Sequence, residues 1–201
     1  MKWYSLIQGF EPEARRFYVS RKGDLEGCEW WHFSEGKRIE KWTSSAWIQS
    51  KSVTEDAPPD DGIVNHFGLL IFSSKMRIAL ENAGISGVQY LPIRVLKSDD
   101  TEHPGYSIAN ALNIVMALNR QESDFSVFPQ DYFDPKDRGR ISGIRKAVLE
   151  QSALQDFHIV RLKEFLEGIY VSELFVNTYN RHRLTGYTFS EVRTTGPSTT
   201  G

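Results

Sequence analysis

The sequence predicts an α+β fold, with a mixed sheet or sheets and packed helices, in a single compact domain. Chain size is the first reason: with 201 residues, 40% of them hydrophobic, folding can bury roughly 70% of the extended chain's surface. The second reason is a series of short apolar and aromatic runs separated by Gly and Pro, which is typical of strands and turns. The third is a strand, helix, turn and strand pattern that occurs twice. A core of this size needs neither a metal nor a disulfide to fold.

Residues 1–62 form an aromatic-rich N-terminal region that contains all five tryptophans. Its glycines break the aromatic runs into pieces that suit short strands and turns. We expect the tryptophans to cover one edge of the core, and a stacking platform for a ligand is the alternative.

An acidic loop is predicted at the end of this region, between Gln49 and Gly62. Val53 is its only large apolar residue, and Pro58 and Pro59 lie within it, so the loop should be exposed. Such charge clusters often serve solvation alone, but a dense patch of one sign also suits docking to a basic partner. The candidate binding residues are Glu55, Asp56, Asp60 and Asp61.

The first repeated unit begins with a continuous apolar run, FGLLIF at 67–72, which predicts a buried strand. Two serines then offer an N-cap, so a helix should begin at Ser74 or the next residue and end at Gly84. A strand from Val88 to Val95 follows, and Pro92 restricts it to a sheet edge or a bulge.

The same pattern returns 98 residues later, where a strand ending at Ser172 leads into a second helix. In this alignment Ser74 corresponds to Ser172, and Gly87 corresponds to Gly186 after a one-residue insertion. Two copies are too few for a solenoid and predict two similar units packed around one shared sheet or on facing sheets. Between the copies, Tyr106–Asn119 is apolar enough to be either a helix or a strand.

These patterns divide the chain into the N-terminal region, an α+β region at 63–193 and a disordered tail at 194–201. We expect the whole to form one compact domain. The internal repeat occupies 67–95 and 165–192.

A search for catalytic or metal-binding patterns favours no enzyme activity, no cofactor and no metal. Cys28 and His32 are four residues apart, but the tryptophans between them favour a strand, which would hold the two side chains apart. The five histidines lack zinc-ligand spacing, and Gly-rich phosphate-binding motifs are missing. A site assembled from distant residues is the remaining enzymatic alternative.

Charge and cysteine content narrow the choice of partners and compartment. A net charge of −2 and an isoelectric point near 6.2 make nucleic acid and anionic membranes poor partners. The single cysteine, Cys28, favours a reducing compartment. Because no signal peptide or apolar run of membrane-spanning length is evident, we expect a cytoplasmic protein.

Three segments carry a resemblance to a known family: LLIFSSKMRIALENAGISGVQYLPI, YSIANALNIVMAL and HIVRLKEFLEGIYVSELFVNTYNRHRLTGYTF. Together they resemble the bacterial polymorphic-toxin immunity family numbered eleven, which was first described as a domain of unknown function. The shared features are an I-x-S-x-x-hydrophobic junction between strand and helix and a closing strand of the form S/T-G-hydrophobic-x-aromatic. The resemblance spans Gly62 to Val192, and its matching serines and glycines are structural in kind.

The resemblance implies a protein that binds and neutralises a cognate toxin. The acidic loop is the first candidate for the toxin-binding face, since a toxin that acts on nucleic acid would have a basic cleft. A non-catalytic, self-associating assembly module is the second hypothesis and an enzyme is the third. The sequence specifies no oligomeric state.

Overall fold

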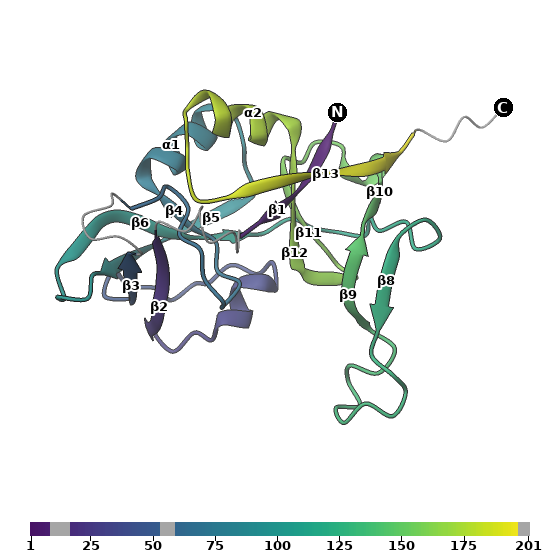
Figure 1. Cartoon of the computed structure of the whole chain (residues 1–201), viewed down its shortest axis with the longest axis horizontal. Helices are drawn as coiled ribbons and strands as arrows, with labels where there is room; N and C mark the ends of the chain where they lie inside the picture. The colour runs from purple at the N-terminus through teal and green to yellow at the C-terminus, as the bar shows by residue number, and fades with distance from the viewer. Residues whose placement is uncertain (9–16, 53–58, 197–201) are drawn as a thin grey trace.

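The computed structural model describes residues 1–8, 17–52 and 59–196 of the chain (Figure 1). Strands hold 42% of the described residues and helices hold 15%. The expected α+β fold with packed helices is therefore wrong, because the fold is β-rich. The two α-helices have nine residues each, so they cover only part of the core, and pairing between strands far apart in sequence builds the rest.

A six-stranded sheet has the strand order β10-β13-β1-β12-β11-β7. The N-terminal strand β1 lies inside this sheet and pairs antiparallel with β12 and β13. Two outer strands pair in parallel, β10 with β13 and β7 with β11. The bounds are β1 Trp3–Ile7, β7 Ile114–Val115, β10 Val148–Glu150, β11 Ile159–Leu162, β12 Phe165–Ser172 and β13 Thr188–Thr195.

A five-stranded sheet has the order β2-β3-β5-β6-β4, and a separate pair of strands, β8 and β9, forms a hairpin. Strand β6 pairs antiparallel with β4 and β5, and β3 pairs in parallel with β5. Two 3-10 helices, η1 (Trp30–Ser34) and η2 (Gln151–Leu154), lie outside the sheets. The strand bounds are β2 Phe17–Asp24, β3 Trp47–Ser52, β4 Ile71–Ser73, β5 Val88–Leu96, β6 Glu102–Ala111, β8 Asp124–Val127 and β9 Ile141–Lys146.

The strands decide the conformation of Tyr106–Asn119 and the position of Pro92 in the sheet. Most of Tyr106–Asn119 is extended, because it contributes to β6 and β7. Pro92 lies where β5 has only β6 beside it, since β3 pairs with β5 from Arg94 onward, so the expected edge position is confirmed. The last described strand, β13, continues to Thr195, and residues 197–201 lie outside the described residues.

Helices α1 (Ser74–Asn82) and α2 (Glu173–Arg181) each follow a strand without a loop and lie together at one end of the molecule (Figure 1). The predicted start of the first helix at Ser74 is confirmed. Its N-cap is Ser73, whose hydroxyl accepts a bond from the Met76 amide, and Ser172 caps α2 in the same way.

The cap positions correct the alignment of the two units. Ser73, and not Ser74, corresponds to Ser172, so the separation is 99 residues. Gly87 and Gly186 are also 99 residues apart, and the one-residue insertion disappears. The helix ends follow the same separation: backbone N–H groups of Ala83 and His182 bond the carbonyls of residues 79 and 178.

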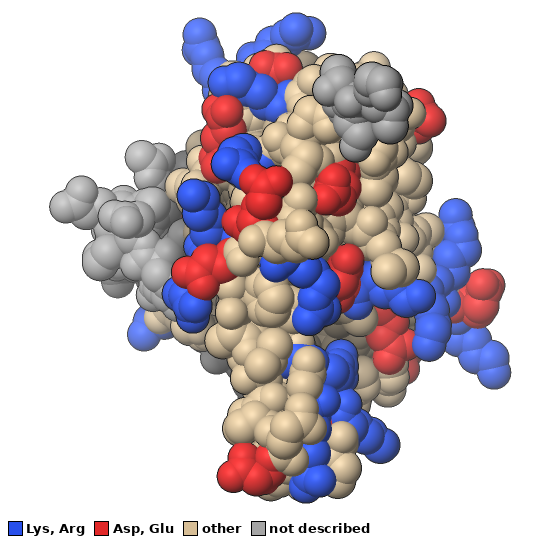
Figure 2. All heavy atoms as spheres, turned by 90° about the vertical axis from the view of Figure 1, so that its right-hand side faces the viewer, with Lys and Arg blue, Asp and Glu red and all other residues tan. Residues whose placement is uncertain are grey.

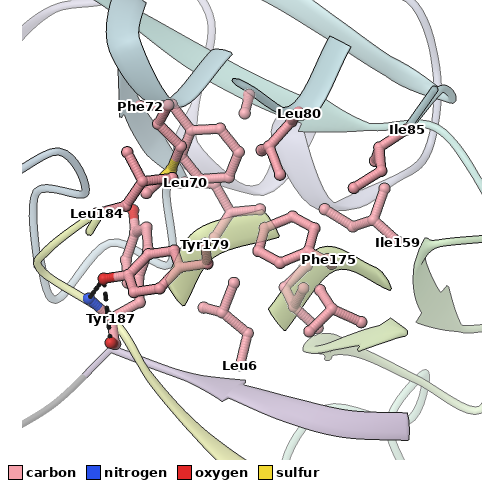
Figure 3. Packing of buried hydrophobic residues seen from close by; sticks show 14 of the residues in the cluster. Leu6, Leu70, Phe72, Leu80, Ile85, Ile159, Phe175, Tyr179, Leu184 and Tyr187 are labelled. Carbon is pink, nitrogen blue, oxygen red and sulfur yellow. Dashed lines mark hydrogen bonds between the residues drawn. The ribbon is translucent and has the colours of Figure 1, made fainter. Parts of the chain in front are cut away.

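The largest part of the core lies between the two units (Figure 3). Buried side chains at corresponding positions of the two units meet there, from both helices and from the turns after them. In the helix pairs, the second helix supplies an aromatic side chain and the first an aliphatic one. The corresponding pairs are Met76 with Phe175, Leu80 with Tyr179, and Ile85 with Leu184.

Tyr187 ties the two units together. Its hydroxyl bonds both the amide (3.1 Å) and the carbonyl (3.2 Å) of Ile71 in β4, and its own backbone bonds the Tyr179 hydroxyl (Figure 3). Next to it, Gly186 has φ of +104°, and a Cβ there would lie 1.9 Å from the Gly62 carbonyl oxygen. The close approach of these two backbone segments therefore requires glycine at position 186.

Candidate interaction surface

A groove of about 840 Å³ lies between η1 and the β8–β9 hairpin. The β8–β9 hairpin projects from the body of the molecule (Figure 1). Residues of the hairpin line one wall of the groove, and residues of η1 line the other. The turn between β11 and β12, together with the first residues of β12, forms the floor. The lining residues that matter below are Trp30, Trp31 and Glu35 from η1 and its end, Phe128, Asp134, Lys136, Asp137 and Arg140 from the hairpin, and Glu164 and Glu167 from the floor.

The η1 wall presents two neighbouring tryptophans to solvent. Trp30 is 41% exposed and Trp31 is 44% exposed, and their rings meet edge to face with centroids 5.6 Å apart. The turn that carries them is anchored by Phe33, which is buried against the ring of Trp42. The expectation that the tryptophans cover the core fits Trp3, which is fully buried. At Trp30 and Trp31 the structure instead holds large aromatic surface in an exposed position, which suits partner binding.

His32 helps to fix this turn. Its Nδ1 accepts a hydrogen bond from the Glu29 amide at 3.0 Å, which closes a reciprocal cap with the Glu29 side chain. The neighbouring Cys28 has a raised pKa, first because of its burial and second because of Glu26. A raised pKa disfavours the thiolate, so the structure gives no support to a Cys28–His32 dyad.

The hairpin wall ends in an aromatic tip. The rings of Phe128, Tyr132 and Phe133 follow one another with centroid separations of 4.5 and 4.4 Å, and Phe133 is 82% exposed. Arg138 donates from Nε to the Tyr132 carbonyl at 2.8 Å, and Arg140 pairs with Asp137 at 2.7 Å. These contacts hold the tip in one shape, which lowers the entropy lost when a partner binds.

Basic residues also lie on the hairpin, which projects at the bottom of the view in Figure 2 with Lys and Arg side chains along one side. Arg145 on β9 pairs with Asp124 on β8, with Nε and Oδ2 2.9 Å apart. Both side chains of this ion pair are exposed, so we assign it little stabilising effect.

The floor of the groove carries two carboxylates that form no ion pair among the described residues, Glu164 and Glu167. One oxygen of Glu164, Oε2, is buried and has no hydrogen-bond partner in the described part of the chain. Below the floor, Arg161 is buried and donates to the carbonyls of Leu166 (2.6 Å) and Phe33 (3.4 Å). Burial lowers the pKa of Arg161 to about 10, while Glu167 acts in the opposite direction.

The lining of the groove is acidic as a whole, with five carboxylates against two cations. Two of the carboxylates are already paired: Glu35 with Lys37 at 2.9 Å and Asp137 with Arg140. A smaller cavity of about 520 Å³ adjoins the groove, shares Trp30, Ser34 and Glu167 with it, and reaches Arg161.

Comparison with known families supports the resemblance seen in the sequence. The model of the Immunity protein family (Imm11) matches residues 14–194. The chain belongs to this family. The match also covers the stretch before Gly62, where the sequence patterns alone showed no resemblance. No curated protein matches the chain.

In this Imm11 protein Asp60 and Asp61 do not line the groove. Glu55 and Asp56 fall outside the described residues. Asp60 is 5% exposed, and its carbonyl accepts a hydrogen bond from the Tyr106 hydroxyl at 2.7 Å.

Asp61 links the two units of the Imm11 protein. Its carboxylate accepts hydrogen bonds from the Ser73 hydroxyl (2.7 Å), the Lys75 ammonium (3.3 Å) and the Thr185 amide (3.2 Å). Its side chain is only 12% exposed. Asp61 therefore supports the start of α1 and the turn after α2 at the same time.

Two further structural findings concern the expected absence of membrane and metal sites. Neither α-helix in the described residues has the length and apolar character needed to cross a membrane. Among the same residues, no three His, Cys, Asp or Glu side chains are grouped so that they could hold a metal ion.

Sequence reasoning missed the groove. The aromatic pair Trp30-Trp31 and the aromatic residues after Pro129 are visible in the sequence, but they are about a hundred residues apart. Two adjacent tryptophans between Gly27 and Gly36 could have indicated an exposed turn. That the hairpin faces this turn depends on the strand order, which local patterns do not encode.

Proposed function

We propose that this Imm11 protein binds a cognate toxin of a bacterial polymorphic toxin system in a stoichiometric complex and thereby blocks the toxin's activity. The family match over residues 14–194 is the observation that carries this proposal. Neutralisation by binding requires no chemistry from the immunity protein itself. We place the encounter in the cytoplasm, which agrees with the single cysteine, Cys28.

The groove supports the proposal because it combines the features of a protein-binding surface. Exposed aromatic residues are frequent energetic centres of interfaces, and Trp30, Trp31 and Phe133 are all exposed at or beside the groove. A tight inhibitor buries about 800 Å² on each partner, and the span from η1 to the hairpin tip offers a continuous surface for that purpose.

The stretch that carries the four candidate residues Glu55, Asp56, Asp60 and Asp61, here called the acidic segment, is proposed as a second contact with a basic toxin. Glu55 and Asp56, which lie outside the described residues, enter the proposal on the sequence alone. Asp60 and Asp61 are proposed to contribute less to toxin binding, because they already form the contacts within this chain described above.

Co-expression tests the proposed function. The tagged protein is produced together with the product of the neighbouring open reading frame, and growth and co-purification are measured. We expect growth to recover and the two proteins to purify as a complex, while an unrelated immunity protein gives neither. If this chain neither rescues growth nor retains the toxin, the proposed function is wrong.

A further inference from the structure

We propose that the groove receives a basic segment of the toxin, with a Lys or Arg side chain flanked by apolar residues. This inference rests on the proposed function and names the chemistry of the surface that performs it. It differs from the acidic-segment proposal, because the residues involved are Trp30, Trp31, Glu164 and Glu167.

Charge is the first argument. The groove lining carries a net negative charge, and the carboxylates of Glu164 and Glu167 have no cation in ion-pair distance among the described residues. Lys136 is the only lining cation outside an ion pair in that part of the chain, since Arg140 is held by Asp137. A positive partner is therefore attracted and a negative one repelled.

The unpaired oxygen of Glu164 is the second argument. A buried polar atom without a hydrogen-bond partner is costly, and Oε2 of Glu164 is such an atom within the described residues. An ammonium or guanidinium group that enters the groove can pair with the carboxylate of Glu164 and offset the cost of holding this charge there. Arg161 does not serve this purpose: its Nη atoms donate to the carbonyls of Leu166 and Phe33, and its Nε has no hydrogen-bond partner in the described part of the chain.

The tryptophan wall is the third argument. Trp rings attract cations placed over their faces more strongly than other aromatic rings do, and this attraction grows when water is excluded. Trp30 and Trp31 line the groove opposite the hairpin, and their remaining exposed surface suits apolar neighbours of the inserted cation. The groove therefore favours a toxin segment that carries a positive charge with apolar residues beside it.

Binding measurements with the purified toxin from the neighbouring reading frame test this inference. The first variant is the double substitution Glu164→Gln with Glu167→Gln, which removes charge and keeps shape. We expect the dissociation constant to rise at least about tenfold, mostly through slower association, and the dependence of affinity on NaCl to become weaker. The second variant, Trp31→Ala, should raise the dissociation constant about thirtyfold.

Matched controls separate this surface from general effects. Glu81→Gln with Glu102→Gln removes the same charge from α1 and β6, and neither residue lines the groove. Ile78→Ala removes an exposed apolar side chain from α1. Both controls should bind the toxin like the wild type, and all four variants should melt within a few degrees of it.

The outcomes distinguish the two proposals. If the wild type binds and the groove variants bind equally well with an unchanged salt dependence, the groove inference is overturned and the proposed function stands. If the wild type does not bind the toxin, the proposed function and the groove inference are both wrong. A selective loss in the groove variants, with unaltered controls, supports the inference.

Discussion

Asp61 shows at the level of a single residue how far an acidic sequence pattern can be interpreted. In the sequence it is one of four carboxylates in a proline-containing loop, and nothing local distinguishes it from Asp56. In the structure its carboxylate joins Ser73 to Thr185, which lies 124 residues away. The composition predicted an exposed loop, but Asp60 is 5% exposed and the Asp61 side chain is 12% exposed, because the packing of the two units buries them.

Charge reversal separates the structural role of Asp61 from the proposed docking role of the acidic segment. We expect Glu55→Lys with Asp56→Lys to slow association with a basic toxin and to leave the melting temperature nearly unchanged. Asp61→Ala removes three charge-assisted hydrogen bonds and should lower the free energy of unfolding by about 2 kcal/mol. Stopped-flow association and thermal melts measure the two effects. An unchanged association rate in the double variant would remove the segment from the interface.

At the level of elements, the helices were the most predictable part of the molecule. Their starts depend on a local serine cap, and the structure places α1 where the pattern predicts it. Strand pairing could not be predicted, because β1 lies between β12 and β13, more than 160 residues along the chain. The same non-local pairing made the groove invisible in the sequence, since its walls belong to η1 and to the β8–β9 hairpin.

Serine substitutions test the corrected alignment of the two units. Ser73→Ala removes the cap of α1 and the bond to Asp61, and Ser172→Ala removes the cap of α2 and a 2.9 Å contact with His158 Nδ1. Each should lower the free energy of unfolding by about 1–2 kcal/mol. Ser74→Ala is the matched control, because Ser74 is exposed and donates only to the Gly105 carbonyl. Chemical denaturation measures all three, and a larger loss at Ser74 than at Ser73 would contradict the assignment.

For the whole molecule, the repetition of one structural unit after 99 residues accounts for the β-rich fold and for the burial of Tyr179 and Tyr187 between the two units. Each unit has a strand, a helix and a second strand, with β6 or β1 inserted antiparallel between the two strands. The sequence made the repeated unit visible, but it did not show how many strands would join each unit, and the expected fold class was wrong for that reason. The core between the units buries Tyr179 and Tyr187.

This burial predicts alkaline unfolding. Desolvation raises the pKa of Tyr170 and Tyr179 to about 12, and it also raises the pKa of three further tyrosines: Tyr90, Tyr106 and Tyr187. Unfolded tyrosines lose their protons near pH ~10, while the folded state keeps them, so stability should fall as the pH rises above that value. Arg161, with a lowered pKa, acts in the opposite direction, but it is one group against five.

Melting temperatures and tyrosinate absorbance between pH ~8 and pH ~11 measure this effect. We expect the melting temperature to fall over this range and the absorbance of these five tyrosines to rise together with unfolding. Full tyrosinate absorbance at the upper pH in a protein that keeps its circular dichroism spectrum and its melting temperature would contradict the burial of these side chains.

In the proposed function, this Imm11 protein neutralises a toxin by forming a complex with it. The decisive experiment is a titration of the purified toxin with the purified protein, with residual toxin activity recorded at each mole ratio. We predict a linear fall in activity that ends at a fixed stoichiometric ratio, with a complex of matching mass in solution. Activity that persists in excess immunity protein, or that disappears at far less than stoichiometric amounts, would contradict the claim.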